Sequence, residues 1–278
     1  ELNLFGTNPL LGDTDRDGLS DGEEINIHKT DPLLSDTDGD ELMDTDEIDL
    51  HKTDPTLPDT DADGLNDGKE INVHGTNPNA ADTDQDGLDD KDEIELKTNP
   101  FEKDTDNDGL SDGNEIKTIG TNPLVRDSDG DDIIDGDEDA DSDGLTNAAE
   151  LNIHDTNPRA PDTDQDGLID GDEVNVTNTK PLVLDSDENG ISDGDEDSDG
   201  DGLSDANELN IHSTHPLFAD IDEDGLTDPE EVALNTDAFN DDTDGDSLND
   251  WWETMVTETD PSKRIESWGT MPIWRLSE

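Results

Sequence analysis

The chain has 278 residues, of which 83 are Asp or Glu and only 14 are Lys or Arg, so its formal net charge is −69. Apolar residues make up 26% of the chain, which is too few for a large hydrophobic core. The charge excludes nucleic acid and anionic membranes as partners, because both would be repelled. No cysteine is present to form a disulfide, and no apolar run is long enough for membrane insertion.

An acidic motif recurs through almost the whole sequence. Its first copy reads Asp-Thr-Asp-Arg-Asp-Gly-Leu-Ser-Asp-Gly-Glu-Glu from Asp13 to Glu24, and a connector ending in Thr-Asp-Pro follows. We number the copies loops 1 to 12 in chain order; they occupy residues 13–24, 36–47, 59–70, 82–93, 104–115, 127–138, 139–150, 162–173, 185–196, 197–208, 220–231 and 242–253. Successive loops start 22 or 23 residues apart, except for two steps of 12 residues within 127–150 and 185–208. We expect the spacing or direction of the array to change at these two short steps.

The oxygen-bearing residues of each loop have the spacing of an EF-hand loop. Calcium takes six to eight oxygen ligands at about 2.3–2.6 Å, and an EF-hand loop supplies them from positions 1, 3, 5, 7, 9 and 12. Short Asp side chains suit a backbone wrapped around the ion, and Glu at position 12 reaches back from the helix that follows. The sequence therefore predicts Ca²⁺ as the cofactor, at about twelve or more ions per chain. Whether each loop holds one ion or two stays open.

The predicted metal ligands form six sets, one for each position of the loop. Position 1 is Asp13, Asp36, Asp59, Asp82, Asp104, Asp127, Asp139, Asp162, Asp185, Asp197, Asp220 and Asp242. Position 3 is Asp15, Asp38, Asp61, Asp84, Asp106, Asp129, Asp141, Asp164, Asp187, Asp199, Asp222 and Asp244. Position 5 is Asp17, Asp40, Asp63, Asp86, Asp108, Asp131, Asp143, Asp166, Asn189, Asp201, Asp224 and Asp246. Position 7, through its backbone carbonyl, is Leu19, Leu42, Leu65, Leu88, Leu110, Ile133, Leu145, Leu168, Ile191, Leu203, Leu226 and Leu248. Position 9 is Asp21, Asp44, Asp67, Asp90, Asp112, Asp135, Asn147, Asp170, Asp193, Asp205, Asp228 and Asp250. Position 12 is Glu24, Glu47, Glu70, Glu93, Glu115, Glu138, Glu150, Glu173, Glu196, Glu208, Glu231 and Glu253.

Glycine stands at position 6 in nine loops, where the turn is sharp, but Glu41, Asp132 and Ser247 replace it in loops 2, 6 and 12. A side chain makes such a turn harder to form, so we expect these three loops to bind their ions most weakly. A disordered acidic chain is the alternative to a folded array, but disorder would need no fixed glycine and no Glu at position 12. We expect disorder only without calcium, because the dense negative charge would then open the chain.

With Asp-x-Asp-x-Asp-Gly-Leu-x-Asp-x-x-Glu followed by Thr-Asn-Pro, the chain resembles the thrombospondin type 3 repeat family. It is most similar to the cysteine-free versions of prokaryotic surface and secreted proteins, and the resemblance covers residues 1–261. The resemblance implies mostly irregular calcium-binding loops with short helices and little or no β-sheet. It also implies that the repeats form an elongated, calcium-stabilised, solenoid-like rod.

Each loop is expected to lead into a short helix that begins near position 9 or 10 and ends before the Thr-x-Pro connector. Aliphatic residues follow the loop Glu directly and two residues later, as at Ile25 and Ile27. Together with position 7 they predict a thin core shared by neighbouring repeats. Histidines recur four residues after the loop Glu, where packing or a helix-end contact explains them better than metal binding: His28, His51, His74, His154 and His212.

Residues 262–278 differ from the repeats, because they are less acidic and contain Trp268 and Trp274. We expect this tail either to cap the last repeat or to form an interface with a flanking domain or another copy of the chain. At the other end, residues 1–9 match residues 24–32, so we expect the sequence to begin inside an array.

The function predicted from these features is that of an extracellular calcium-rigidified stalk, spacer or fibre component of a prokaryotic surface or secreted protein. Two alternatives remain open: a calcium-dependent adhesion or dockerin-like module that binds protein or glycan, and an accessory region of a secreted enzyme. The chain itself is not expected to be an enzyme, because no nucleophile elbow or phosphate-binding loop is present.

Overall fold

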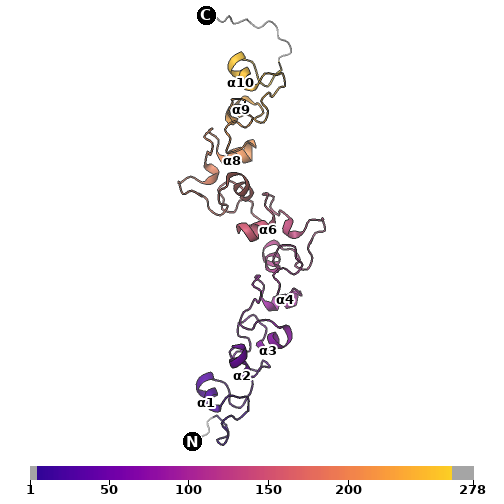
Figure 1. Cartoon of the computed structure of the whole chain (residues 1–278), viewed down its shortest axis with the longest axis vertical. Helices are drawn as coiled ribbons and strands as arrows, with labels where there is room; N and C mark the ends of the chain where they lie inside the picture. The colour runs from indigo at the N-terminus through magenta and orange to yellow at the C-terminus, as the bar shows by residue number, and fades with distance from the viewer. Residues whose placement is uncertain (1–4, 265–278) are drawn as a thin grey trace, which may run out of the picture. The chain divides into compact units, whose positions relative to one another are not determined.

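The computed structural model describes residues 5–264, in which short helical turns alternate with irregular acidic loops (Figure 1). No strand occurs in this part of the chain, which confirms the predicted fold class. The chain divides into two units, Glu1–Glu138 with loops 1 to 6 and Asp139–Glu278 with loops 7 to 12. None of the helices between residues 5 and 264 has the length and hydrophobicity needed to span a bilayer.

Two backbone positions of every loop, positions 4 and 6, are left-handed. In loop 1 they are Arg16 and Gly18, with φ of 71° and 111°. The three loops without glycine at position 6 have a glycine at position 4 instead, and their position 6 has φ between 78° and 83°: Glu41, Asp132 and Ser247. One of the two left-handed positions is therefore glycine in each of these loops, which reduces the strain that the sequence alone indicated.

The aspartates of a loop hold its backbone in place by accepting hydrogen bonds from its amides. In loop 1, Asp13 Oδ1 accepts a hydrogen bond from the amide of Arg16 at 2.6 Å. Asp15 Oδ1 accepts one from the amide of Asp17 at 3.3 Å, and Asp17 Oδ1 accepts one from that of Leu19 at 2.8 Å. The same pattern recurs along the chain. In most loops the second oxygen of the position 1 Asp also accepts a hydrogen bond from the amide of position 6, as Asp59 Oδ2 does from Gly64 at 3.0 Å. A second oxygen at position 3, such as Asp38 Oδ2, is left for another partner.

The predicted short helix is confirmed, and it begins at position 9. In most repeats a three-residue α-helical turn spans positions 9 to 11: α1 (Asp21–Glu23), α2 (Asp44–Asp46), α3 (Asp67–Lys69), α5 (Asp112–Asn114), α6 (Asn147–Ala149), α7 (Asp170–Asp172), α8 (Asp205–Asn207) and α10 (Asp250–Trp252). A five-residue π-helical turn continues from position 12: η1 (Glu24–His28), η2 (Glu47–His51), η3 (Glu70–His74), η4 (Glu115–Ile119), η6 (Glu150–His154), η7 (Glu173–Thr177), η9 (Glu208–His212) and η10 (Glu253–Thr257). Two repeats have one continuous α-helix: α4 (Asp90–Leu96) and α9 (Asp228–Leu234). Loops 6 and 9 have only a 3₁₀ turn: η5 (Asp135–Asp137) and η8 (Asp193–Asp195).

Neighbouring loops are joined by a hydrogen bond from position 10 of one loop to position 5 of the loop before it. In the first unit, the amide of Gly68 donates to Asp40 Oδ2 at 2.8 Å. In the second unit, the amide of Trp251 donates to Asp224 Oδ2 at 2.9 Å. The carboxylate at position 5 therefore contacts two loops at once.

The short step inside the second unit changes the order of these contacts. Gly194 of loop 9 donates its amide to Asp166 Oδ2 of loop 8 at 3.2 Å, as expected for a neighbour. Asn210, which follows loop 10, also contacts loop 8, because its Nδ2 donates to the carbonyl of Gly167 at 2.9 Å. Two successive repeats thus share one neighbour at this step.

The predicted core is wrong in one respect, because the second aliphatic residue after the loop Glu faces solvent. In five repeats this side chain is 66% to 73% exposed: Ile27, Leu50, Val73, Ile153 and Ile211. The helical turn directs the loop Glu and the connector Thr toward the loop, so this residue is left on the outer face. Position 7 is the main apolar position that is buried, as at Leu168 and Leu226, both 0% exposed.

We expect Gly113, at position 10 of loop 5, to tolerate no side chain. A Cβ there would lie 2.3 Å from the carbonyl oxygen of Asp86, and a backbone atom cannot move aside cheaply. Gly113→Ala should lower the free energy of unfolding of the calcium-loaded chain by about 1–3 kcal/mol, measured by denaturant unfolding. Gly22→Ala is the matched control, since it changes position 10 of loop 1, where the nearest atom to a Cβ is 3.9 Å away. Equal losses in the two variants would contradict the close approach between loops.

Candidate metal centres

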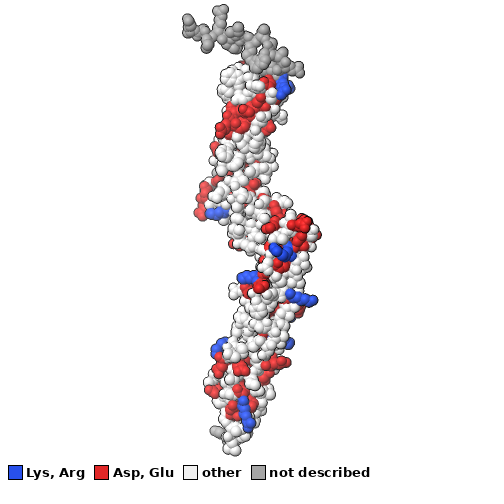
Figure 2. All heavy atoms as spheres, turned by 45° about the vertical axis from the view of Figure 1, so that its right-hand side comes forward, with Lys and Arg blue, Asp and Glu red and all other residues white. Residues whose placement is uncertain are grey.

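Most of the described residues that have no exposed surface are acidic. The position 12 carboxylate is 0% exposed in ten loops: Glu24, Glu47, Glu70, Glu93, Glu115, Glu150, Glu173, Glu208, Glu231 and Glu253. On the face drawn in Figure 2, Asp and Glu are limited to patches and Lys and Arg are few. In the described part of the chain, one ion pair between a basic and an acidic side chain occurs, Lys263–Asp260. Buried carboxylates are costly without a cation, and the basic side chains do not provide it.

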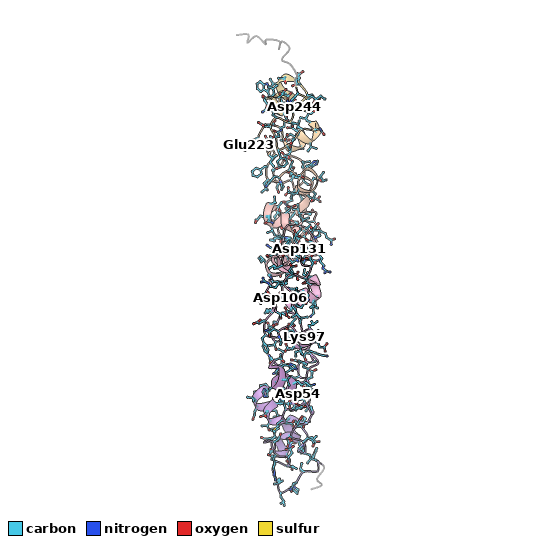
Figure 3. The ribbon with its side chains drawn as sticks, turned by 90° about the vertical axis from the view of Figure 1, so that its right-hand side faces the viewer. Asp54, Lys97, Asp106, Asp131, Glu223 and Asp244 are labelled. Atoms are coloured by element: carbon cyan, nitrogen blue, oxygen red, sulfur yellow. The ribbon has the colours of Figure 1, made fainter. Side chains whose placement is uncertain are left out.

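Within a loop, the carboxylates of positions 1, 3 and 5 converge. Asp13, Asp15 and Asp17 each bring an oxygen within 4.8 Å of the others, as do the corresponding residues of loops 2 and 3. Figure 3 shows the described side chains and labels two residues at position 3, Asp106 and Asp244. The predicted first three ligands of these loops are therefore close enough to share one ion.

A second group of carboxylates lies between successive loops. Asp17 and Glu24 of loop 1 group with Asp44, which is position 9 of loop 2. Asp40 and Glu47 of loop 2 group in the same way with Asp67 of loop 3 (both groups within 4.8 Å). Position 9 was predicted to serve the ion of its own loop, but the structure places it with positions 5 and 12 of the loop before.

The recurring Thr or Ser at position 2 explains where position 9 lies. Thr37 donates its amide to Asp44 Oδ1 and its hydroxyl to Asp44 Oδ2, both at 2.7 Å. Thr60 holds Asp67 in the same way, at 2.8 and 2.6 Å. The same contact recurs at most position 9 carboxylates, and the regular Thr or Ser at position 2 was the signal in the sequence that could have revealed it.

Several buried carboxylate oxygens have no hydrogen-bond partner. The connector Thr binds one oxygen of the position 12 Glu, as Thr53 Oγ1 does to Glu47 Oε1 at 3.1 Å. Glu47 Oε2 is left without a partner, and so is Asp38 Oδ2 at position 3 of the same loop. Hard, anionic oxygens that converge in this way are the donor set of a calcium site, so these residues fit the predicted ion.

Burial and neighbouring carboxylates raise the pKa values of the position 12 side chains. Burial, followed by the carboxylate of Asp38, raises the pKa of Glu47 to about 8. Burial is also the main cause at seven further loops, in which the pKa of the Glu is raised to about 8: Glu70, Glu93, Glu115, Glu150, Glu173, Glu208 and Glu231. Without a cation, each of these carboxyl groups is more stable with a proton.

Loops 6 and 9, which precede the short steps, differ from the other ten. Their position 12 residues, Glu138 and Glu196, have extended backbone with ψ of 154° and 155°, so no π-helical turn follows. Ile133 and Ile191 at position 7 are 46% and 49% exposed. Among the described residues, each of the other ten loops buries unpartnered oxygens at positions 3 and 12, whereas these two loops bury none there.

In loop 9 a side-chain amide hydrogen-bonds the position 12 carboxylate. Asn189 stands at position 5, and its Nδ2 donates to Glu196 Oε1 at 2.6 Å. The side-chain amide of Asn189 thereby occupies one oxygen of Glu196 that would face a cation in the other loops.

The remaining predicted residues are placed as follows. Position 7 donates its amide to position 5, as from Leu19 to Asp17, and the role of its carbonyl stays a prediction. Asn147, at position 9 of loop 7, accepts the amide of Ala140 at 3.2 Å. The five repeated histidines are half-buried at the ends of their helical turns. Most of the predicted tail, from residue 265 on, lies outside the described residues.

A comparison with protein families finds the model described as "Bacterial TSP3 repeat". It matches eight segments that together cover more than half of the chain: residues 13–35, 59–81, 82–102, 104–125, 139–159, 162–183, 197–213 and 220–239. Loops 2, 6, 9 and 12 lie outside these segments.

Among solved structures, the chain is similar to "Biofilm associated protein - B domain", with 42% identity over 16% of this chain and 11% of that chain, and a TM-score of 0.16. It is also similar to "Biofilm associated protein - BSP domain", with 44% identity over 16% of this chain and 7% of that one, and a TM-score of 0.15. The match thus spans about a tenth or less of each of those chains. No curated protein matches the chain.

We expect the stability of the metal-free fold to fall as the pH rises. The buried Glu side chains have pKa values of about 8 in the fold and an ordinary value of 4.5, so the folded chain holds more protons than the unfolded chain between these values. The free energy of unfolding without metal should therefore be highest near pH 4.5 and decrease up to about pH 8. Circular dichroism in chelator at pH 5 and pH 8.5 tests this, with excess calcium as the control. A metal-free chain that is better folded at pH 8.5 would contradict it.

We expect loops 6 and 9 to hold calcium most weakly, because their position 12 carboxylates are not enclosed. This replaces the order inferred from position 6, which named loops 2, 6 and 12. Hydrogen exchange during a calcium titration should show the amides of 127–138 and 185–196 gaining protection at higher calcium than those of loops 4 and 8. Simultaneous protection of all twelve loops would show that burial of the position 12 carboxylate does not determine the calcium affinity of a loop.

Proposed function

Because the chain belongs to the bacterial TSP3 repeat family, we propose that it is an extracellular, calcium-rigidified array that acts as a stalk, spacer or fibre component of a prokaryotic surface or secreted protein. TSP3 repeats are calcium-binding repeats, and the acidic clusters of this chain suit that ion. The observation that supports the proposal most directly is the set of buried carboxylate oxygens without partners, at positions 3 and 12 of ten loops.

We assign two kinds of calcium site to the array. One ion binds within a loop, on positions 1, 3 and 5, as on Asp13, Asp15 and Asp17. A second ion binds between loops, on positions 5 and 12 and on position 9 of the next loop, as on Asp17, Glu24 and Asp44. Both groupings of carboxylates occur repeatedly. The chain would then bind more than one ion per loop, except where a loop is open or has no following loop.

Calcium would provide the stability that a hydrophobic core provides elsewhere. Extracellular calcium modules bind with dissociation constants of about 10⁻⁴–10⁻³ M. Each ion at a hundredfold excess over its dissociation constant stabilises the fold by roughly 2.7 kcal/mol. Because many ions add their contributions, a chain with so few buried aliphatic side chains can be stable in calcium-bearing surroundings outside the cell.

The contacts between loops favour a stiff spacer over a flexible tether. The carboxylate at position 5 would bind ions and also accept a hydrogen bond from a backbone amide of the next loop. Asp40 accepts this hydrogen bond from the amide of Gly68. Fixing an ion in one loop therefore also orients the following loop, so stiffness is expected to propagate from repeat to repeat.

Adhesion is the second candidate function, and one observation favours it. Exposed aliphatic side chains recur at one position of the repeat, as at Ile153 and Ile211, and give an acidic surface regular apolar positions. In the second unit, Ile153 also borders a groove of about 430 Å³, whose lining includes His154, Lys180 and Leu182. A protein partner of the adhesion module would bind there.

Small-angle scattering with and without a chelator, together with a metal count, tests the proposed function. We expect an elongated particle with more than one calcium per loop at millimolar calcium, and an expanded, flexible chain after chelation, because the like charges then repel. Magnesium at the same concentration is the control, since it prefers six-coordinate sites and keeps its waters. An elongated particle that keeps its shape after all metal is removed would refute the proposal.

A further inference from the structure

Asn189, at position 5 of loop 9, is the only asparagine in the sequence that is followed by glycine. An asparagine loses its side-chain amide when the backbone nitrogen of the next residue attacks Cγ and closes a succinimide ring. Glycine in the next position favours this attack, because it has no side chain to obstruct the nitrogen. Both Asn189 and Gly190 are exposed, and a Cβ added at Gly190 would have no atom beyond its chain neighbours within 4 Å. Ring closure is therefore unobstructed, and water reaches the ring.

Hydrogen bonds hold each group that would react. The amide nitrogen of Gly190 donates to Asp185 Oδ2 at 2.8 Å. Asn189 Oδ1 accepts a hydrogen bond from the amide of Ile191 at 2.8 Å. Asn189 Nδ2, the leaving group, donates to Glu196 Oε1 at 2.6 Å. The attacking nitrogen thus has a carboxylate as its partner, and the oxygen that gains charge has a donor.

We propose that Asn189 deamidates within the folded chain, and that the resulting aspartate gives loop 9 the position 5 carboxylate that the other eleven loops carry. The conversion itself depends only on groups of loop 9. Its effect on ion binding rests on the calcium array proposed above.

The reaction needs no reagent other than water. The Gly190 nitrogen forms a bond to Asn189 Cγ and gives its proton to Asp185, which is within reach as a general base. The amide of Ile191 stabilises the negative charge that develops on Oδ1. Asp185 then returns the proton to Nδ2, the bond from Cγ to Nδ2 breaks, and ammonia leaves. Water opens the succinimide, so that the net reaction consumes one water, releases one ammonia and oxidises nothing.

The ring opens to one of two products. Water that attacks Cγ breaks the new bond to the Gly190 nitrogen and leaves aspartate with a normal backbone. Water that attacks the backbone carbonyl of residue 189 leaves isoaspartate, whose backbone is one carbon longer. Only the first product keeps the turn that places position 5 beside position 12.

Aspartate fits loop 9 without a change in the turn. Asn189 Oδ1 accepts the amide of Ile191 at 2.8 Å, as Asp166 Oδ1 accepts the amide of Leu168 at 2.8 Å in loop 8. The contact that is lost is the one from Nδ2 to Glu196. Two carboxylates then face each other where an amide and a carboxylate were bonded, and a cation is needed to hold them together. Loop 9 would thereby acquire the complete ligand set of loop 6, the other loop whose position 12 residue is extended.

Peptide mass spectrometry of the full chain tests the conversion. The chain is incubated at neutral pH and at the lowest calcium concentration that protects loop 8. Asn189 should deamidate about tenfold or more faster than Asn107, which is exposed at position 4 of loop 5 but is followed by Asp. An Asn189 that stays intact in the folded chain, and deamidates only after unfolding in denaturant, would show that its hydrogen bonds protect the amide and would overturn the proposal.

The role of Asp185 has its own test in the same assay. Asp185→Asn removes the base and should slow deamidation of Asn189 in the folded chain about tenfold or more. Glu188→Gln is the matched control, because it removes an exposed acid of the same loop that touches none of the reacting atoms, and Gln occupies the same left-handed position in loops 4 and 8. It should change the rate by less than about twofold. Equal rates in Asp185→Asn and the original chain would overturn the assignment of the base.

Hydrogen exchange during a calcium titration tests the consequence for loop 9. In Asn189→Asp, the amides of 185–196 should gain protection at about tenfold lower calcium than in the original chain, at the concentration that protects loop 6, because a ligand charge is added. An unchanged calcium dependence, or deamidation that yields only isoaspartate, would overturn the gain of a calcium ligand. Loop 8 separates this result from the proposed function: a loop 8 that no calcium concentration protects refutes the array, while the mass spectra still decide whether Asn189 deamidates.

Discussion

Carboxylate groups that are buried without basic partners are the constraint on which this fold depends. Glu47 and its equivalents have no exposed surface, and their second oxygens have no hydrogen-bond partner. Such a group is stable only when a cation or a proton neutralises it. The apolar side chains that are buried with them are few, so they cannot compensate for that cost. With calcium as the proposed cation, folding of the array and binding of its ions would be coupled.

The residue at position 5 links this local constraint to the order of the repeats. Asp40 belongs to two groups of carboxylates, one with Asp36 and Asp38 of its own loop, the other with Glu47 of its own loop and Asp67 of the next loop. It also accepts a hydrogen bond from the amide of Gly68. A single side chain thus connects two groups of ligands and two loops. Where Asn replaces this Asp, at Asn189, the amide binds Glu196 directly and the loop is more open. Uniform long steps therefore favour a regular, stiff array, and each short step introduces a loop with different properties.

Much of the candidate site could be predicted from the sequence, because its geometry is local. Asp13, Asp15 and Asp17 are alternate residues on one tight turn, so their spacing alone places their carboxylates together. Asp44 could not be assigned in this way, because its partners Asp17 and Glu24 belong to the preceding loop. Ile27 was predicted to be in a core, but its environment depends on how a π-helical turn orients the residues after Glu24. Loop 6 could not be distinguished by ligand type, since its acidic ligands are complete and the exposure of Ile133 results from the path of the chain after Glu138.

The sequence by itself determined the number of loops, the convergence of positions 1, 3 and 5 within a loop, the short helices and the family, because these follow from a repeat whose chemistry is complete within about a dozen residues. The tertiary structure decided which carboxylates meet between loops, which two loops stay open and which aliphatic side chains face solvent. The physical reason is that contacts across a junction depend on the distance and orientation of two backbones. A spacing along one chain does not contain that information, however regular its repeat.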